Sequence, residues 1–291
     1  MILYYLIVPI LFFFAYWPTN WLYKFAYVIA FLLRDVVRYR SKVAYNNIKN
    51  SFPEKSEQEI NRIFHNSYRY LADRVVENIK CFTITMDEVE ERVQISNPEL
   101  LSDCYKRGQH LVMMASHIST WEFGGYRAIT ASEHDNFAVV AVVSNPRFNA
   151  LIQRTRAKMG MNLIMMDKAK DFLVQPLTKV TAGIFISDQS PSNMKTCYWT
   201  TFLNQETAFF TGAERYARNN NAMVIYPKIT ERKHGYFTAE IIEITRDPNS
   251  LPFGAITEKF ARIIEQQLRE NPSDWLWTHK RWKHKRNKVQ G

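Results

Sequence analysis

A histidine and a glutamate five positions apart are the first residues of this sequence that could do chemistry together. Residues 111–115 form a short apolar run, which predicts a buried strand, and His117 comes just after it. Glu122 lies where a helical pattern begins. Ligands of open α/β sheets bind at the carboxyl ends of the strands, so we expect both side chains at the binding edge of the sheet.

This pair suggests acid–base chemistry. A histidine base presents one ring nitrogen to the substrate, while a carboxylate holds the other, fixes the tautomer and stabilises the imidazolium. With Glu122 in that role, His117 would take the proton of a substrate hydroxyl, which would then attack an acyl thioester. The alternative is an ordinary loop histidine and a solvated glutamate, because this spacing also arises by chance among seven histidines.

A second polar group follows another predicted strand. Residues 183–187 form an apolar run that delivers Asp188 and Gln189 to a loop at its carboxyl end, as the earlier strand delivers His117. The alternative for Asp188 is a cap that forms a turn. Residues 190–206 have no clear periodicity and carry several aromatic side chains. An aromatic loop beside the candidate site would suit an acyl chain.

Basic residues gather on the helix predicted to begin after residue 145. They are Arg147, Arg154, Arg156 and Lys158. One interpretation is recognition of phosphate on an acceptor or a carrier, because the planar fork of arginine matches phosphate oxygens. The other interpretation is a basic face that only meets solvent.

The N-terminal stretch predicts contact with a membrane. Residues 1–23 carry no charged side chain, and residues 1–17 are almost wholly apolar, slightly short of the ~20 that a spanning helix needs. Neither a basic start nor a small-residue cleavage site marks a signal peptide. We therefore expect a membrane anchor and an interfacial helix at residues 1–33 and the main domain at residues 34–291. The alternative is a buried helix of a soluble protein.

The overall charge favours an anionic partner. The 291 residues include 38 Lys and Arg against 28 Asp and Glu, a net charge of +10, which suits nucleic acid, anionic lipid or an acidic carrier protein. Tryptophans and cations alternate in residues 275–286 and suit either nucleic acid or a membrane interface, unless the segment simply packs on the domain. The apolar N-terminus favours the membrane. Three distant cysteines indicate neither a zinc site nor a disulfide framework.

Short strand patterns alternate with helical patterns along the rest of the chain. A capping box at residues 56–59 opens a long helix with an apolar stripe that reaches residue 79. Later strand patterns cover residues 137–143, 163–166, 222–226 and 236–244. This alternation predicts an α/β fold with a mixed central sheet flanked by helices.

Several motifs in a fixed order give the chain a family resemblance. The sequence resembles the bacterial late lipid A acyltransferases of the lauroyl and myristoyl type, within the lysophospholipid acyltransferase superfamily. The motifs that carry this resemblance are residues 21–23 (WLY), 39–54 (YRSKVAYNNIKNSFPE), 67–73 (SYRYLAD), the spacing of His117 and Glu122, and residues 188–191 (DQSP), 211–213 (TGA) and 275–282 (WLWTHKRW).

The resemblance implies a glycerolipid acyltransferase-like fold anchored at the cytoplasmic face of the cell inner membrane. It implies transfer of a fatty acyl chain to a hydroxyl of a lipid A precursor, with acyl carrier protein or coenzyme A as the thioester donor. Further partners would be the membrane lipid acceptor and an anionic lipid surface, not nucleic acid, and no metal or redox cofactor is implied. His117 would be the general base and Glu122 its orienting carboxylate, with Arg154, Asp188 and Gln189 binding substrate.

Other functions stay open at this point. An acyltransferase for another lysolipid, aminolipid or glycolipid would use the same chemistry. A non-catalytic basic protein that binds membranes or nucleic acid would not depend on His117. A serine hydrolase fits poorly, because the chain lacks a Gly-x-Ser-x-Gly elbow.

Overall fold

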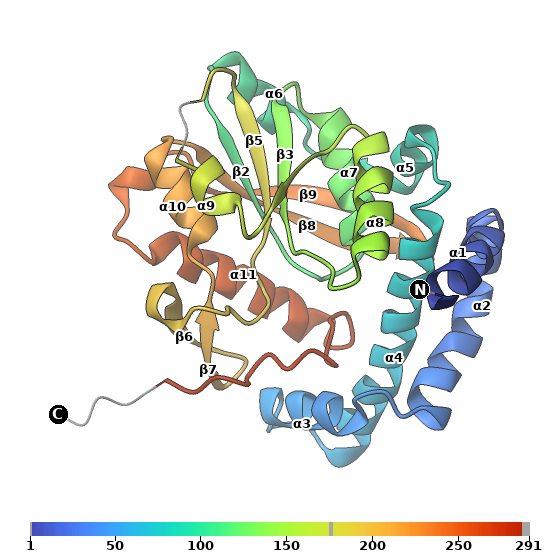
Figure 1. Cartoon of the computed structure of the whole chain (residues 1–291). Coiled ribbons are helices and arrows are strands. Elements are labelled where there is room, and N and C mark those ends of the chain that lie inside the picture. Colours follow the sequence, from blue (N-terminus) through green and yellow to red (C-terminus); the bar gives the residue numbers. More distant parts are fainter. Residues whose placement is uncertain (1, 175–176, 287–291) are drawn as a thin grey trace.

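A seven-stranded sheet forms the centre of the molecule (Figure 1). In the computed structural model, which describes residues 2–174 and 177–286, the strand order is β1-β9-β8-β2-β5-β3-β4. All neighbours are parallel except β8 and β9, which form an antiparallel pair. The predicted mixed α/β sheet is therefore confirmed. Its strands are β1 (Val93–Ile95), β2 (Leu111–Ala115), β3 (Asp135–Val140), β4 (Asn162–Met165), β5 (Thr181–Ile186), β8 (Met223–Lys233) and β9 (Tyr236–Thr245).

Helices cover both faces of the sheet, which explains why the central strands are apolar without interruption. Alternate residues of β2 enter different clusters, Val112 and Met114 on one face and Leu111 and Met113 on the other. The helices are α3 (Ser41–Ser51), α4 (Glu57–Lys80), α5 (Met86–Arg92), α6 (Glu99–Lys106), α7 (Trp121–Ala131), α8 (Pro146–Lys158), α9 (Ala169–Phe172), α10 (Gly212–Asn219) and α11 (Ala255–Glu270), with short 3-10 turns η2 (Met194–Thr196) and η3 (Pro248–Ser250).

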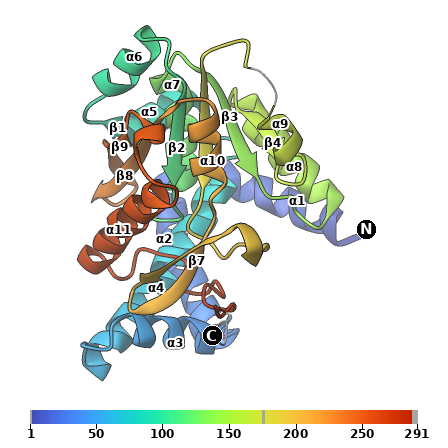
Figure 2. The ribbon, with the colours of Figure 1, turned by 90° about the vertical axis from the view of Figure 1, so that its left-hand side faces the viewer.

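The aromatic stretch expected as a loop contains a hairpin of two further strands, β6 (Tyr198–Phe202) and β7 (Gln205–Phe209). Its turn residues Leu203 and Asn204 both have a positive φ, 48° and 62°. The side chain of Asn204 donates to the carbonyl of Ser51, so the hairpin is fixed to the end of α3. Figure 2 shows β7 beneath the sheet, on the side where α3 lies.

The N-terminal stretch forms two short helices, α1 (Ile2–Ala15) and α2 (Thr19–Phe31), which are separated at Pro18 and followed by a π-helical turn, η1 (Leu32–Val36). Figure 1 shows α2 alongside α4. Among residues 2–174 and 177–286, no helix combines the length and the apolar character needed to cross a membrane. The predicted membrane-anchoring helix is thus not confirmed.

These two helices nevertheless leave many apolar side chains in solvent. The inner face of α2 is buried through Leu22, Tyr23 and Ala26. The outer faces of α1, α2 and η1 and the turn between the two helices expose Tyr5, Leu6, Ile10, Phe13, Tyr16, Trp21, Tyr27, Val28, Phe31, Leu32 and Val36. We call this set the apolar outer face. Exposed apolar patches of this kind mark contact with a membrane or another protein.

Two of the three tryptophans of the C-terminal segment are buried in the core, and the third is partly buried. Trp275 and Trp277 are almost fully buried, and Trp282 stacks on Trp277 with 6.4 Å between the ring centroids. The predicted position of these rings at a membrane interface is therefore wrong. Trp277 packs against Phe52, and Trp275 packs against Phe202, so both rings are removed from water by the core of the protein.

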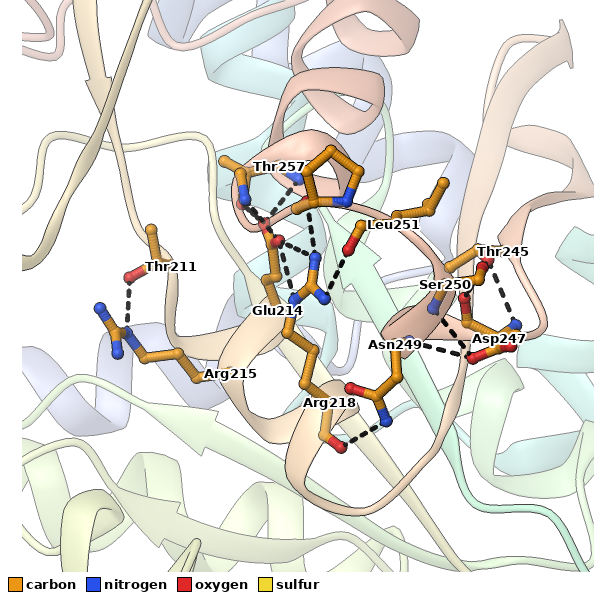
Figure 3. A network of polar contacts seen from close by, with 12 residues as sticks. Thr211, Glu214, Arg215, Arg218, Thr245, Asp247, Asn249, Ser250, Leu251 and Thr257 are labelled. Carbon is orange, nitrogen blue, oxygen red and sulfur yellow. Dashed lines mark hydrogen bonds and ion pairs between the residues drawn. The ribbon is translucent and has the colours of Figure 1, made fainter.

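A buried glutamate connects α10 to the start of α11 (Figure 3). The carboxylate of Glu214 accepts hydrogen bonds from the backbone N–H of Gly254 (2.7 Å) and from both the backbone N–H (3.0 Å) and the hydroxyl (2.6 Å) of Thr257. It also pairs with Arg218 at 2.9 Å. Glu214 thus accepts hydrogen bonds from N–H groups at the amino end of α11 that have no partner within the helix. Its negative charge is also attracted to the positive end of that helix dipole.

We expect Glu214→Ala to lower the free energy of unfolding by about 3 kcal/mol, because Arg218 would lose its carboxylate partner and α11 would lose its cap. Thermal unfolding followed by circular dichroism measures the change. The control is Glu243→Ala, which removes an exposed ion pair with Arg246 and should change the melting temperature little. Equal melting temperatures for the two variants would contradict this role of Glu214.

Candidate active site

His117 and Asp188 meet at one edge of the sheet because their strands are neighbours. Strands β2 and β5 run parallel with Ala115 opposite Ile186, so the loops that follow them leave side by side. The Nδ1 atom of His117 lies 2.8 Å from the Asp188 carboxylate, and the His117 backbone N–H donates to the other carboxylate oxygen at 3.0 Å. A carboxylate only accepts, so Nδ1 carries the proton and Nε2 is the basic nitrogen.

Asp188 is fully buried, yet its surroundings keep it ionised. Burial raises the pKa of this carboxyl, but the charge of His117 and hydrogen bonds from His117 and Trp275 outweigh it and lower the pKa to about 2. The ring of His117 is partly exposed, with 18% of its side-chain surface accessible. A buried anion therefore orients a histidine that a substrate can reach.

Gln189 lies on the outward side of the same ring. Its side-chain nitrogen is 3.3 Å from Nε2 of His117. Since Nε2 is the acceptor in this tautomer, the amide donates to it. Gln189 thus contacts the nitrogen that would receive a substrate proton.

The predicted contact between Glu122 and His117 is wrong. Glu122 lies in the first turn of α7, where its carboxylate forms a two-point ion pair with Arg156 of α8. The partner of the histidine ring is Asp188, which the sequence analysis had placed with the substrate-binding residues. The reason is geometric, because Asp188 follows the strand next to β2 and so reaches the ring of His117. Glu122 instead pairs with the permanently charged guanidinium of Arg156.

Arg154 lies exposed on α8. The described hydrogen bonds and ion pairs do not connect it to His117, Asp188 or Gln189. Arg156, two residues further along, is the arginine that joins this helix to the site through Glu122. The structure thus brings His117, Asp188 and Gln189 together, whereas Glu122 and Arg156 form an ion pair of their own.

Tyr70 of α4 holds the histidine loop, a contact that the sequence analysis did not predict, although Tyr70 lies in the motif at residues 67–73. Its buried hydroxyl donates to the carbonyl of His117 at 2.7 Å and lies 3.2 Å from that of Ser119. Ser119 has a φ of 61°, a conformation that costs energy for a residue with a Cβ and needs support from its surroundings. Burial raises the pKa of Tyr70, so this hydroxyl remains a donor.

Two apolar cavities lie beside this loop. One, of about 390 Å³, lies between α4, α7 and α8, and its wall includes Trp121 and Glu122. Its apolar lining includes Leu11, Leu71, Val75, Ile79, Phe82, Phe148, Ile152 and Leu276. The other, a narrow space of about 50 Å³ between α7 and the sheet, is lined by Ser116 and Ile118, which flank His117, and also by Trp121.

Two details define these cavities. The ring of Trp121 meets that of His117 edge-on, with 5.0 Å between centroids, so one side chain borders the histidine and both cavities. Gly124 in the narrow space faces the end of the Ile229 side chain, which a Cβ at this position would have to displace. Within the described residues, no group of three His, Cys, Asp or Glu side chains is arranged to hold a metal ion.

We expect Glu122→Met to lower the free energy of unfolding by about 2 kcal/mol, because it leaves the mostly buried Arg156 without a partner. The double variant Glu122→Met and Arg156→Met should recover most of this loss, since it removes both charges and keeps the apolar volume. Urea unfolding of the two proteins measures the difference. A double variant less stable than Glu122→Met alone would show that the ion pair does not act as a unit.

Comparison with known proteins was made at the level of families and of individual chains. The sequence model of one family, described as bacterial lipid A biosynthesis acyltransferase, matches residues 1–284. The match therefore includes both apolar N-terminal helices, the whole sheet and the C-terminal tryptophans.

Individual relatives are distant but cover most of the chain. The lipid A biosynthesis lauroyltransferase of Escherichia coli K12 is 20% identical over 272 residues, which are 91% of this chain and 86% of the relative. The palmitoleoyltransferase of the same organism is also 20% identical, over 88% of this chain and 82% of its own. A lipid A biosynthesis acyltransferase of Haemophilus influenzae is 19% identical over 84% of this chain and 78% of its own.

Proposed function

Because the chain belongs to the family of bacterial lipid A biosynthesis acyltransferases, and is itself an acyltransferase, we propose that it moves a fatty acyl chain from a thioester to a hydroxyl of a lipid A precursor. Family membership sets aside the non-catalytic alternative. The observation that best supports the proposed chemistry is the His117–Asp188 pair at the binding edge of the sheet, next to two apolar cavities.

In the proposed mechanism, Nε2 of His117 takes the proton of the acceptor hydroxyl as the hydroxyl oxygen attacks the thioester carbonyl carbon. Negative charge passes to the carbonyl oxygen of a tetrahedral intermediate. The carbonyl then re-forms, the carbon–sulfur bond breaks, and the thiolate leaves with the proton from His117. Asp188 stabilises the imidazolium throughout, without itself taking the proton.

Gln189 would serve the same intermediate. At rest its amide donates to Nε2 of His117. Once Nε2 carries a proton, that nitrogen no longer accepts, and the amide N–H becomes available to the oxyanion. Donors aimed at the charge that develops in the transition state are a large source of catalytic rate.

The larger cavity, of about 390 Å³, would hold the acyl chain. Each buried methylene contributes about 0.8 kcal/mol to binding, so a closed apolar wall can discriminate between chain lengths. The larger cavity lies directly against Glu122 and Arg156. This buried ion pair would fix α7 to α8 and so keep the shape of the cavity.

The outer surface of α8 would receive the acyl donor. Arg147, Arg154 and Lys158 are exposed on this helix, whose inner face lines the larger cavity through Phe148 and Ile152. A basic surface at a chain-binding cavity suits an acidic acyl carrier protein, because complementary charge speeds and orients association. Arg154 would thus contact the donor and not the reacting atoms.

The apolar outer face would place the enzyme on the cytoplasmic side of the inner membrane. Helices with one apolar face can lie in the interfacial plane of a bilayer, and aromatic rings favour the headgroup level. A net charge of +10 adds attraction to anionic lipid. The lipid acceptor could then reach His117 without leaving the bilayer completely.

An in vitro assay tests this proposal. Purified full-length protein is mixed with a lipid A precursor, or in a parallel reaction with a lysophospholipid. The donor is either an acyl carrier protein thioester or the coenzyme A thioester of the same chain, and mass spectrometry identifies the products. We expect the precursor to gain one acyl chain, faster from the carrier protein. Transfer to a lysophospholipid but not to the lipid A precursor would show that the proposed acceptor is wrong.

A further inference from the structure

The C-terminal segment reaches the active site through Trp275. The indole Nε1–H of this residue donates to the Asp188 carboxylate at 2.7 Å, and both side chains are buried. The oxygen that accepts this bond also accepts the backbone N–H of His117, which leaves the other oxygen for the His117 ring. Trp275 thus supplies the third hydrogen bond to the carboxylate that orients the histidine.

Neighbouring rings hold the indole in this position. Trp275 meets Trp277 edge-on at 5.1 Å, Trp282 at 5.9 Å and Phe202 at 5.9 Å between centroids. The other two tryptophans of this cluster direct their N–H groups elsewhere. Trp277 donates to the carbonyl of Pro272, and Trp282 donates to the hydroxyl of Thr207. Three adjacent indoles therefore share one cluster, but only Trp275 donates to the catalytic pair.

We propose that Trp275 is a positioning residue of the active site, whose indole N–H fixes the Asp188 carboxylate so that one oxygen stays directed at the ring of His117. This inference rests on the proposed function, in which His117 is the base. Without the indole N–H, both donors to the Asp188 carboxylate would come from His117 itself. Trp275 adds a donor from a different segment of the chain, which restricts rotation of the carboxylate relative to the histidine ring.

Conversion of each tryptophan to phenylalanine separates this role from simple packing. Trp275→Phe keeps an aromatic ring but removes the donor, and we expect kcat to fall about tenfold with KM nearly unchanged. In a plot of kcat against pH, the acidic side of the curve should also move to higher pH, by about half a pH unit. The reason is that a carboxylate with one donor fewer binds the imidazolium more strongly.

Trp277→Phe and Trp282→Phe are the matched controls. Both remove an indole N–H from the same cluster and should lower the melting temperature, but neither should move the pH profile. A Trp275→Phe enzyme with the same pH profile as these controls would overturn the inference. If His117→Ala proved fully active, the proposed base would be excluded instead, and if the wild-type protein transferred no acyl chain, the proposed function would fail; the three failures can thus be told apart.

A second measurement does not require the Trp275→Phe protein to fold. The seven tryptophans of the full-length protein can be labelled with ¹⁵N in the indole ring. Asp188→Asn keeps the size of the side chain but removes its charge, so it should shift the Trp275 indole N–H signal more than any other. Trp277→Phe and Trp282→Phe identify the neighbouring signals. An unshifted Trp275 signal would also overturn the inference.

Discussion

Asp188→Asn should lower kcat by about 10³- to 10⁴-fold. The amide nitrogen of asparagine would face Nδ1 of His117 as a donor, so the ring would change tautomer and Nε2 would carry a proton instead of accepting one. The side chain keeps its size, so the fold should survive. Acyl transfer by the purified variant, measured under single-turnover conditions, gives the loss in the chemical step.

Glu122→Gln is the matched control for this prediction. It makes the same chemical change in the carboxylate that the sequence spacing favoured, but Glu122 pairs with Arg156 and not with the histidine. We expect a loss of activity at least tenfold smaller than that of Asp188→Asn, because Glu122 acts on the site only through its contact with Arg156. Equal losses in the two variants would show that Glu122 serves the base as much as Asp188 does.

His117→Ala should lower kcat by about 10²- to 10⁴-fold, the usual contribution of a general base. Circular dichroism must first show that the variant is folded. The loss should not add to that of Asp188→Asn, because residues that act as a unit lose their effect together. Full activity of folded His117→Ala protein would exclude the proposed base.

Much of the fold could be predicted because the central strands are buried on both faces. Their apolar runs, such as residues 111–115, are strong signals, and the predicted mixed sheet is present. The β6–β7 hairpin could not be predicted with the same method. Its strands are short and lack regular alternation, and its turn uses Leu203 in a left-handed conformation that this residue type seldom adopts.

The candidate site shows a different limit of the sequence. The spacing of His117 and Glu122 describes neighbours along the chain, but the partner of the ring comes from the next strand in the sheet. The order β2-β5 is a property of long-range packing and has no local signal. Two apolar strands that each end in a polar residue did indicate that His117 and Asp188 share an edge. Only the structure shows that Asp188 contacts the histidine ring and that Glu122 contacts Arg156.

The two ends of the chain show how composition can mislead. The tryptophans and cations of residues 275–286 have the composition of a membrane-interface segment, but Trp275 and Trp277 fill the core. The N-terminal apolar stretch is divided at Pro18, and its inner face packs on α4. Composition could not show which apolar side chains the rest of the protein covers.

The mass of lipid A tests the central claim most directly. Lipid A is extracted from cells without the gene, and from the same cells after return of the wild-type gene or of His117→Ala. We predict that deletion removes the mass of one acyl chain, that the wild-type gene restores it, and that His117→Ala does not. Identical lipid A masses in all three strains would contradict the claim that His117 directs acyl transfer to a lipid A precursor.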